Sequence, residues 1–305
     1  MEQRVIIIAG PTCSGKTALS VLLAKALNSE VISADSRQVF KYLNVGTAKP
    51  ASYEMREVKH YFIDEIEPDV SFNANVFEQK SFEIIKQLHS KEIIPIVAGG
   101  SGLYIRALVN GITESAIYSD EIRETLLKEK EEKGIDFLYK KLEKLDPVSA
   151  SRMLPQNWKR VLRALEVFLF TGKPIWEHHL EYKRDCDVQF LQFALNWERA
   201  ILYANIDKRV DQMMESGLVD EVKSILEMGY PASLNALNTV GYKEIIEYLE
   251  GEISLDYAVE LIKRNTRRYA KKQMTWFRAD ERITWLNIES PKDLPALKNK
   301  IISQL

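Results

Sequence analysis

One stretch near the start of the chain restricts the possible folds more than any other. Residues 5–9 form an apolar run that leads directly into Gly10, Pro11, Thr12, Cys13, Ser14, Gly15, Lys16 and Thr17. A Gly-x-x-x-x-Gly-Lys-Thr pattern between a buried strand and a helix is typical of a phosphate-binding loop. Its backbone N–H groups converge on phosphate oxygens, and the following helix adds the positive end of its dipole. The pattern therefore predicts an α/β fold that binds a phosphorylated ligand.

The last two residues of this loop have defined chemical roles. Lys16 supplies a positive charge beside the phosphates, so we expect it to act in catalysis. Thr17 offers a hydroxyl to Mg²⁺, which prefers oxygen ligands that it shares with substrate phosphates. We therefore expect Mg²⁺ as the cofactor and Thr17 as its protein ligand.

Two further strands are predicted to end beside this loop. Residues 30–34 are followed by Asp35, Ser36, Arg37 and Gln38, and residues 93–98 are followed by a glycine-rich turn that contains Ser101. Ligands of open α/β sheets bind at the carboxyl ends of the strands, so the three loops should line one crevice. Asp35 can hold Mg²⁺ or take a proton there, although Asp in this position is also a common helix N-cap. The glycine-rich turn can bring the backbone close to a ligand, or it can be only a tight turn.

The character of the sequence changes between residues 115 and 186. Charged, helix-periodic segments replace the β-branched runs, which predicts an inserted all-helical domain. Ser119 and Asn157 are expected to cap two of its helices. Residues 1–114 and 187–305 would then form a P-loop NTPase-like core, with a parallel sheet flanked by helices. Further helices of this core are expected near residues 198–215, 218–227, 242–249 and 255–278.

Composition excludes several classes of protein. No apolar run approaches the roughly 20 residues that cross a bilayer, so we expect no membrane association and a cytoplasmic location. Two cysteines, Cys13 and Cys186, are too few for a disulfide framework or a zinc cluster. The formal net charge is −2, so local basic patches would have to hold any nucleic acid.

One such patch lies in residues 263–278, which contain seven basic residues and no acidic one. An ordinary exposed helix mixes the two signs to gain i,i+4 pairs, so this composition favours polyanion binding. Arg264, Arg268, Lys271 and Lys272 fall near one face of the predicted helix. A second cluster, Lys159, Arg160 and Arg163, lies on an insertion helix. It either binds a polyanion or pairs with Glu166 or Glu177.

Several motifs together resemble the tRNA dimethylallyltransferase family. They are residues 10–17, 35–40, 45–50, 99–104, 163–174, 240–244 and 269–278, in the same order as in that family. The resemblance implies transfer of a dimethylallyl group from dimethylallyl diphosphate to N6 of adenosine 37, beside the tRNA anticodon. It also implies that an ATP-binding label for this loop would reflect the type of loop rather than the reaction.

The resemblance also implies roles for individual residues. Asp35 is the expected general base, and Ser101 is expected to touch the target nucleotide near the reaction centre. The insertion is expected to grip the anticodon stem, and the enzyme to act as a monomer. The expected tRNA-binding residues are Asp35, Ser36, Arg37, Gln38, Ser101, Arg123, Lys159, Arg160, Val161, Leu162, Arg163, Arg264, Arg268 and Lys271.

The chain departs from the family pattern at a few positions. Cys13 replaces the usual Ala, Ser101 a Thr, Tyr61 a His, and Lys159-Arg160 a Gln-Arg pair. Ser101 keeps the hydroxyl, whereas Lys159 makes a base contact less favoured and a phosphate contact more favoured. Three alternatives stay open at this point: an adenylate isopentenyltransferase acting on a free nucleotide, a small-molecule kinase, and a non-catalytic tRNA-binding module.

Overall fold

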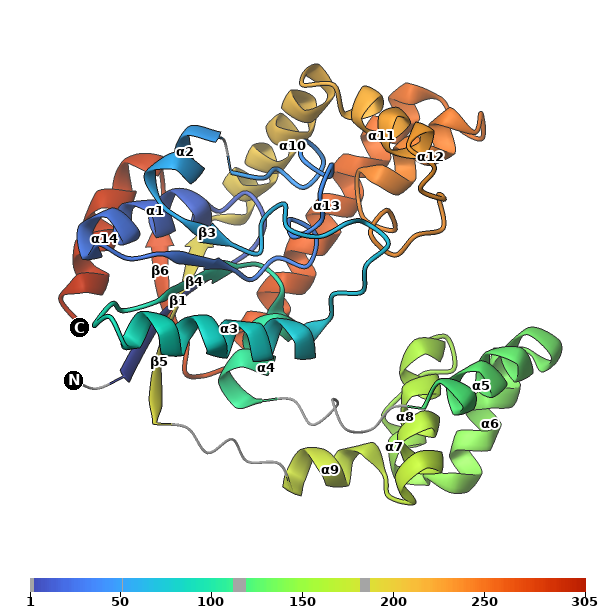
Figure 1. Ribbon diagram of the computed structural model, residues 1–305. Helices are drawn as coiled ribbons and strands as arrows, with labels where there is room; N and C mark the ends of the chain where they lie inside the picture. The colour runs from blue at the N-terminus through green and yellow to red at the C-terminus, as the bar shows by residue number, and fades with distance from the viewer. Residues whose placement is uncertain (1–2, 51, 112–118, 182–186) are drawn as a thin grey trace. The chain divides into compact units, whose positions relative to one another are not determined.

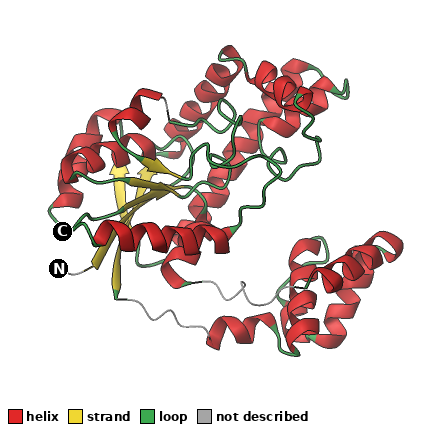
Figure 2. Cartoon of the chain, in the orientation of Figure 1, coloured by secondary structure: helices red, strands yellow, loops and turns green. Residues whose placement is uncertain are grey.

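The computed structural model describes residues 3–50, 52–111, 119–181 and 187–305. The chain forms two compact units: Met1–Arg106 with Asp187–Leu305, and Ala107–Cys186. Among the described residues, strands occur only in the first unit (Figure 2). The boundaries expected after residues 114 and 186 fall at segments 112–118 and 182–186, which lie outside the described residues.

The described part of the first unit contains a six-stranded sheet with the strand order β3-β2-β4-β1-β5-β6 (Figure 1). Every neighbouring pair is parallel. The strands are β1 (Gln3–Ala9), β2 (Val31–Ser33), β3 (His60–Tyr61), β4 (Ile96–Gly99), β5 (Val188–Trp197) and β6 (Thr284–Ile288). The expected fold, a parallel sheet flanked by helices, is confirmed.

The apolar run of residues 5–9 explains the central place of β1. Ile6 pairs with Ile96 of β4 on one side and with Leu191 of β5 on the other. Residues 5–9 are all fully buried. A parallel strand with neighbours on both edges and helices on both faces needs a continuous apolar sequence rather than an alternating one.

Helices complete the first unit. One group, α1 and α14, packs together and against the strands, with Leu19, Leu297 and Ile301 in the shared core. A second group, α10 to α13, forms a helical layer (Figure 1). The helices are α1 (Lys16–Leu27), α2 (Ser52–Glu57), α3 (Ala74–His89), α4 (Gly102–Asn110), α10 (Arg199–Glu215), α11 (Leu218–Glu227), α12 (Tyr242–Leu249), α13 (Leu255–Arg278), the 3₁₀ turn η2 (Pro291–Asp293) and α14 (Leu294–Ile302).

The second unit is helical throughout its described residues. Its helices are α5 (Asp120–Lys133), α6 (Ile135–Leu145), α7 (Pro147–Ser151), α8 (Trp158–Thr171) and α9 (Ile175–Glu181). Leu126, Leu138 and Leu165 are fully buried in its core. The Ser119 hydroxyl caps α5 by accepting from the backbone N–H of Ile122 at 3.3 Å, as predicted. Asn157 precedes α8 but its side chain makes no capping hydrogen bond, which corrects that expectation.

Candidate active site

The phosphate-binding loop joins β1 to α1 at the carboxyl end of the central strand. Gly10 and Gly15 have φ angles of +140° and +89°, which L side chains rarely adopt. Cys13 also has a positive φ, +62°. The helix α1 begins at Lys16, directly after the loop. Its free backbone N–H groups and dipole therefore face the same space as the loop.

Two side chains from distant elements hold this loop in place. Trp197, the last residue of β5, donates from its indole N–H to the carbonyl oxygen of Ser14 at 2.9 Å. Gln273 of α13 accepts from the backbone N–H of Thr12, also at 2.9 Å. These two hydrogen bonds tie the loop to β5 and to α13.

Lys16 points back over the loop. Its Nζ donates to the carbonyl oxygen of Pro11 at 2.5 Å. Burial lowers the pKa of Lys16 to about 8, and the nearby carboxylate of Asp35 partly opposes this shift. The ammonium group is therefore mostly charged at neutral pH. Because it is already buried, an anionic ligand that binds to it has little water to displace.

The three loops expected to share a crevice do line one cavity of about 350 Å³. It is bounded by residues 12–18, by Asp35 and Gln38, and by residues 98–100. Residues 47–50 complete its wall. This confirms that the loops come together at the carboxyl ends of β1, β2 and β4.

Asp35 lies at a tight junction between two of these loops. Its Oδ1 accepts from the backbone N–H groups of Arg37 and Gln38 at 2.9 and 3.3 Å. The hydroxyl of Ser101 accepts from the backbone N–H of Ser36 at 3.0 Å. Asp35 therefore stabilises a local turn, as an N-cap residue does, and also faces the cavity.

Two of the expected nucleotide-binding side chains are engaged within the protein. Arg37 Nη1 donates to the carbonyl oxygen of Asn235 at 2.6 Å, and burial lowers the pKa of Arg37. The amide nitrogen of Gln38 donates to the carbonyl oxygens of Thr47 and Ala48 at 3.2 and 3.1 Å. Gln38 thus holds the wall of the cavity.

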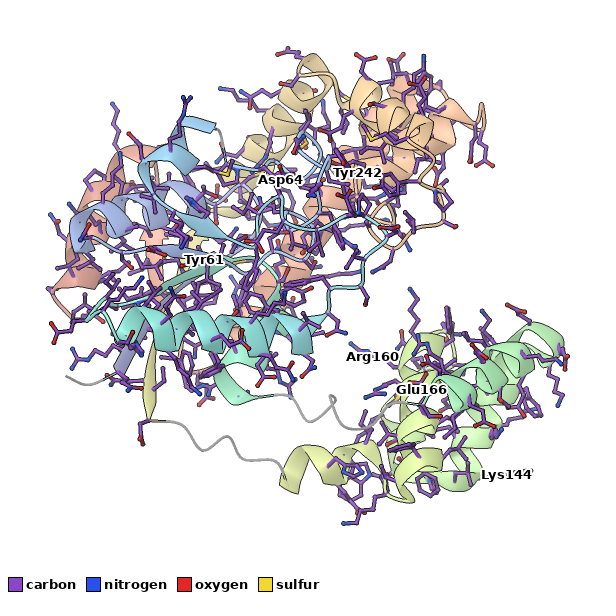
Figure 3. All side chains as sticks on the ribbon, in the orientation of Figure 1. Tyr61, Asp64, Lys144, Arg160, Glu166 and Tyr242 are labelled. Carbon is purple, nitrogen blue, oxygen red and sulfur yellow. The ribbon has the colours of Figure 1, made fainter. Side chains whose placement is uncertain are left out.

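A carboxylate from the helical layer fixes the same wall. Glu221 accepts from the backbone N–H groups of Asn44, Val45 and Gly46 at 2.7–3.1 Å. Tyr242, which is fully buried in the helical layer (Figure 3), donates its hydroxyl to Glu221 at 2.6 Å. Burial raises the pKa of Tyr242. A Cβ on Gly46 would come within 2.4 Å of the Tyr242 ring, so only glycine fits there.

A second cavity of about 330 Å³ shares several residues with the first, among them Cys13, Asp35 and Arg209. The rest of its lining includes the basic side chains of Arg37 and Lys243 and the apolar side chains of Ile206, Val210, Met213, Val240 and Ile262. A charged cavity and a more apolar one therefore share the wall that carries Asp35. Such a pair suits a ligand with an anionic end and a short hydrocarbon end.

Arg209 on α10 is a site residue that the sequence reasoning missed. Its Nη1 lies 3.7 Å from the Sγ of Cys13, and its Nη2 donates to the carbonyl oxygen of Ala48 at 3.4 Å. It lines both cavities. The guanidinium thus adds a further cation to the cavity at the phosphate-binding loop, which Lys16 and Lys49 also line.

The basic stretch forms the second half of α13, as predicted. Lys263 pairs with Asp211 at 2.7 Å, and Arg267 pairs with Asp207. Acids on α10 therefore neutralise two of the seven basic residues, which the sequence of α13 alone did not indicate. Arg264, Arg268 and Lys271 are exposed, together with Lys272.

The family model described as IPP transferase matches residues 38–280. The chain belongs to the IPP transferase family. A tRNA dimethylallyltransferase from Acetivibrio thermocellus is 47% identical over 298 residues, which cover 97% of this chain and 95% of that protein. One from Carboxydothermus hydrogenoformans is 43% identical over 308 residues, covering 100% and 98%.

Solved structures agree with this membership of the IPP transferase family. The tRNA isopentenylpyrophosphate transferase of Bacillus halodurans is 37% identical, with a TM-score of 0.73, over 99% of this chain and 96% of that one. A eukaryotic dimethylallyltransferase acting on tRNA is 28% identical, with a TM-score of 0.81, over 99% and 80%. The family resemblance inferred from the motifs is confirmed.

In this member of the IPP transferase family, the expected RNA-binding segment of α8 is partly buried. Val161 and Leu162 are 0% and 1% exposed in the core of the second unit. Their side chains pack into this core, so a contact of these two residues with tRNA, which stays a prediction, would have to involve the backbone. Glu166 on α8 (Figure 3), itself 3% exposed, pairs with Arg123 at 2.7 Å and with Arg163 at 3.3 Å.

Lys159 and Arg160 lie at the start of α8. With Gln156, Asn157 and Trp158 they line an open hollow of about 270 Å³. The ammonium group of Lys159 lies 5.7 Å from the ring centroid of Trp158, and that of Lys130 lies 4.3 Å from it. Basic groups around an aromatic ring suit stacking and phosphate contacts with RNA.

Tyr61, which stands where the IPP transferase family usually has His, donates its hydroxyl to Glu30 at 2.5 Å and accepts from Lys59 at 2.6 Å. Tyr61 is therefore part of a hydrogen-bonded network at β3.

In the described parts of the chain, no helix is long and apolar enough to cross a membrane.

Proposed function

We propose that this chain is a tRNA dimethylallyltransferase, which transfers a dimethylallyl group from dimethylallyl diphosphate to N6 of adenosine 37 in tRNA. The observation that carries the proposal is the pair of joined cavities with Asp35 on their shared wall, one built on the phosphate-binding loop and the other with more apolar lining from α10 and α13. The names of the relatives support the same reaction.

The charged cavity would hold the diphosphate. Its donors are the backbone N–H groups of the phosphate-binding loop, the start of α1, Lys16 and Arg209. As the donor reacts, negative charge builds up on the leaving diphosphate. Pre-organised donors that face this charge lower the barrier, since they need no rearrangement during the reaction.

The alkylation itself needs a base beside the nucleophile. The bond from the dimethylallyl carbon to the diphosphate oxygen breaks, and its electron pair leaves with the diphosphate. A new bond forms from that carbon to N6 of adenosine, and the N6 proton passes to the carboxylate of Asp35. A positioned base of this kind accelerates a reaction by about 10²- to 10⁴-fold.

The residues present also suit Mg²⁺. Thr17 and Asp35 both line the cavity around Lys16. The described residues contain no group of three or more metal-ligating side chains. Mg²⁺ needs no such group, because one or two protein oxygens suffice beside substrate phosphates and waters. When bound there, Mg²⁺ would neutralise charge on the diphosphate.

The acceptor would be held by exposed basic residues. Arg264, Arg268 and Lys271 offer a cationic face on α13, and the second unit adds Lys159 and Arg160 at an aromatic ring. The target adenine has to leave its stack to reach Asp35, which costs a few kcal/mol. Contacts with the phosphates and the extruded base must offset that cost.

We also predict that the protein is a monomer and that it is located in the cytoplasm.

A single incubation tests the proposal. A tRNA carrying adenosine 37 is mixed with the protein, dimethylallyl diphosphate and Mg²⁺ without ATP, and the nucleosides are then analysed by mass spectrometry. We expect one dimethylallyl group on adenosine 37 and release of diphosphate. Modification of free AMP but not tRNA would instead identify an adenylate isopentenyltransferase. A strict requirement for ATP would identify a kinase, and RNA binding without turnover a binding module.

A further inference from the structure

Gln273 is a buried amide on the helix that carries the exposed basic residues. Its side chain is 6% exposed. Its Oε1 accepts from the backbone N–H of Thr12 at 2.9 Å, and its Nε2 donates to the carbonyl oxygen of Gly100, also at 2.9 Å. One side chain therefore connects α13 to two loops that are 261 and 173 residues away in the sequence.

The contact with the glycine-rich turn leaves no room for a side chain. A Cβ on Gly100 would lie 2.2 Å from Nε2 of Gln273, and a Cβ on Gly102 would lie 2.2 Å from Cδ1 of Trp276. Tyr269 of the same helix lies beside Ser101 and Gln273 and lines both cavities. Glycine in this turn is thus explained by the close approach of α13.

The two sets of side chains lie on different faces of α13. Tyr269, Gln273 and Trp276 have the i, i+4, i+7 spacing of one helical stripe. Arg264, Arg268 and Lys271 also have that spacing, and a turn of 100° per residue places their stripe on roughly the opposite side. The stripe with Gln273 contacts the loops around the phosphate site, and Tyr269 and Trp276 keep exposed fractions of 42% and 37% there. The basic stripe is exposed and contacts neither loop through the residues named here.

We propose that Gln273 is a positioning residue that couples occupancy of the basic face of α13 to diphosphate binding at the phosphate-binding loop. A polyanion on Arg264, Arg268 and Lys271 restrains α13, and Gln273 passes that restraint to Thr12 and Gly100. This inference rests on the proposed function for the identity of the two ligands. Such coupling is reciprocal, because each ligand must change the affinity for the other by the same factor.

The test measures the affinity of the protein for magnesium diphosphate with and without a saturating anticodon stem-loop RNA. In the wild-type chain we expect the RNA to tighten diphosphate binding by about fivefold or more. In Gln273→Met, which keeps the volume but loses both hydrogen bonds, we expect weaker diphosphate binding and a ratio near one. RNA affinity without diphosphate should stay within about twofold of wild type.

Leu261→Met is the matched control, because Leu261 is a buried residue of the same helix that lines neither cavity. It should keep the wild-type ratio. A purely structural role for Gln273 would lower the melting temperature and leave the ratio unchanged, which would overturn the inference. A wild-type ratio of one would also overturn it.

A second variant covers the case in which Gln273→Met does not fold. Gly100→Ala brings a methyl group into the space of Nε2 and should abolish the coupling from the other side of the contact. If Gly100→Ala instead kept the wild-type ratio, the inference would be overturned. The tRNA incubation described above separates the two proposals, since a chain that modifies tRNA but shows no coupling loses only this one.

Discussion

The guanidinium of Arg209 lies 3.7 Å from the Sγ of Cys13, although 196 residues separate the two in the sequence. A cation from α10 thus reaches the phosphate-binding loop. We expect Arg209→Gln to lower kcat/KM for dimethylallyl diphosphate by about 10- to 150-fold, because charge-assisted hydrogen bonds to phosphate contribute about 1.5–3 kcal/mol. Lys208→Gln removes the neighbouring exposed charge and should leave kcat/KM unchanged. Equal effects of the two variants would contradict the role of Arg209.

Cys13 provides a chemical probe of the same space. It is a free thiol that lines both cavities. In a Cys186→Ser background, iodoacetamide should inactivate the protein, and bound magnesium diphosphate should slow the inactivation. Cys13→Ala should resist the reagent. Alkylation at an undiminished rate in the presence of saturating diphosphate would show that the anion binds elsewhere.

The contacts by which Asp35 holds a turn and its proposed role as general base can be separated by substitution. Asn keeps the oxygen that accepts from the N–H groups of Arg37 and Gln38, but it cannot take a proton. We expect Asp35→Asn to lower the single-turnover rate by about 10²- to 10⁴-fold with tRNA affinity retained. Asp35→Ala should also lose stability, because the turn is no longer held. A normal rate in Asp35→Asn would exclude the general-base role.

The lowered pKa of Lys16 leads us to expect that donor binding depends on pH. Burial lowers its pKa to about 8 in the free protein, and a bound diphosphate would favour the charged form and raise that pKa. Binding therefore takes up a proton above pH 8, and affinity should fall as the pH rises through this value. Titration with an unreactive donor analogue between pH 7 and 9.5 checks this. Lys16→Met should bind weakly with a flat profile, and an equally steep decline in that variant would assign the effect to another group.

The basic face of α13 can be tested by salt dependence. Arg268 is exposed, whereas Lys263 on the same helix pairs with Asp211 at 2.7 Å. We expect Arg268→Gln to weaken RNA binding and to reduce the slope of log K against log salt by about one, since one fewer phosphate is neutralised. Lys263→Gln should change the slope little. Identical slopes for Arg268→Gln and wild type would place the RNA on another surface.

Much of the fold could be predicted from local patterns. The boundaries of α11, α12 and α13 match the expected residues, because apolar periodicity and flanking Gly or Ser residues define them. The strand β3 and the helix α2 were missed. Two residues of strand and six of helix are too short for either periodicity to appear.

The residues of the candidate site also fall into those that local patterns predict and those that they do not. Lys16 was found from the phosphate-binding loop pattern. Asp35 and Ser101 were found because they follow strands, and the ends of parallel strands converge whatever the details of packing. Arg209 and Gln273 are single residues within long amphipathic helices, and nothing in their spacing distinguishes them from their neighbours. Their roles depend on the rotation of each helix against the sheet, which only tertiary packing sets.

The hydrogen bond from the Trp197 indole to the carbonyl oxygen of Ser14 makes the intrinsic fluorescence of Trp197 a probe of the phosphate-binding loop. Indole emission responds to the polarity and movement of its immediate surroundings, and this indole touches the backbone that would enclose a phosphate. Occupancy of the loop should therefore be visible in the native fluorescence of the unlabelled chain. The other four tryptophans can be replaced by Phe to isolate that signal.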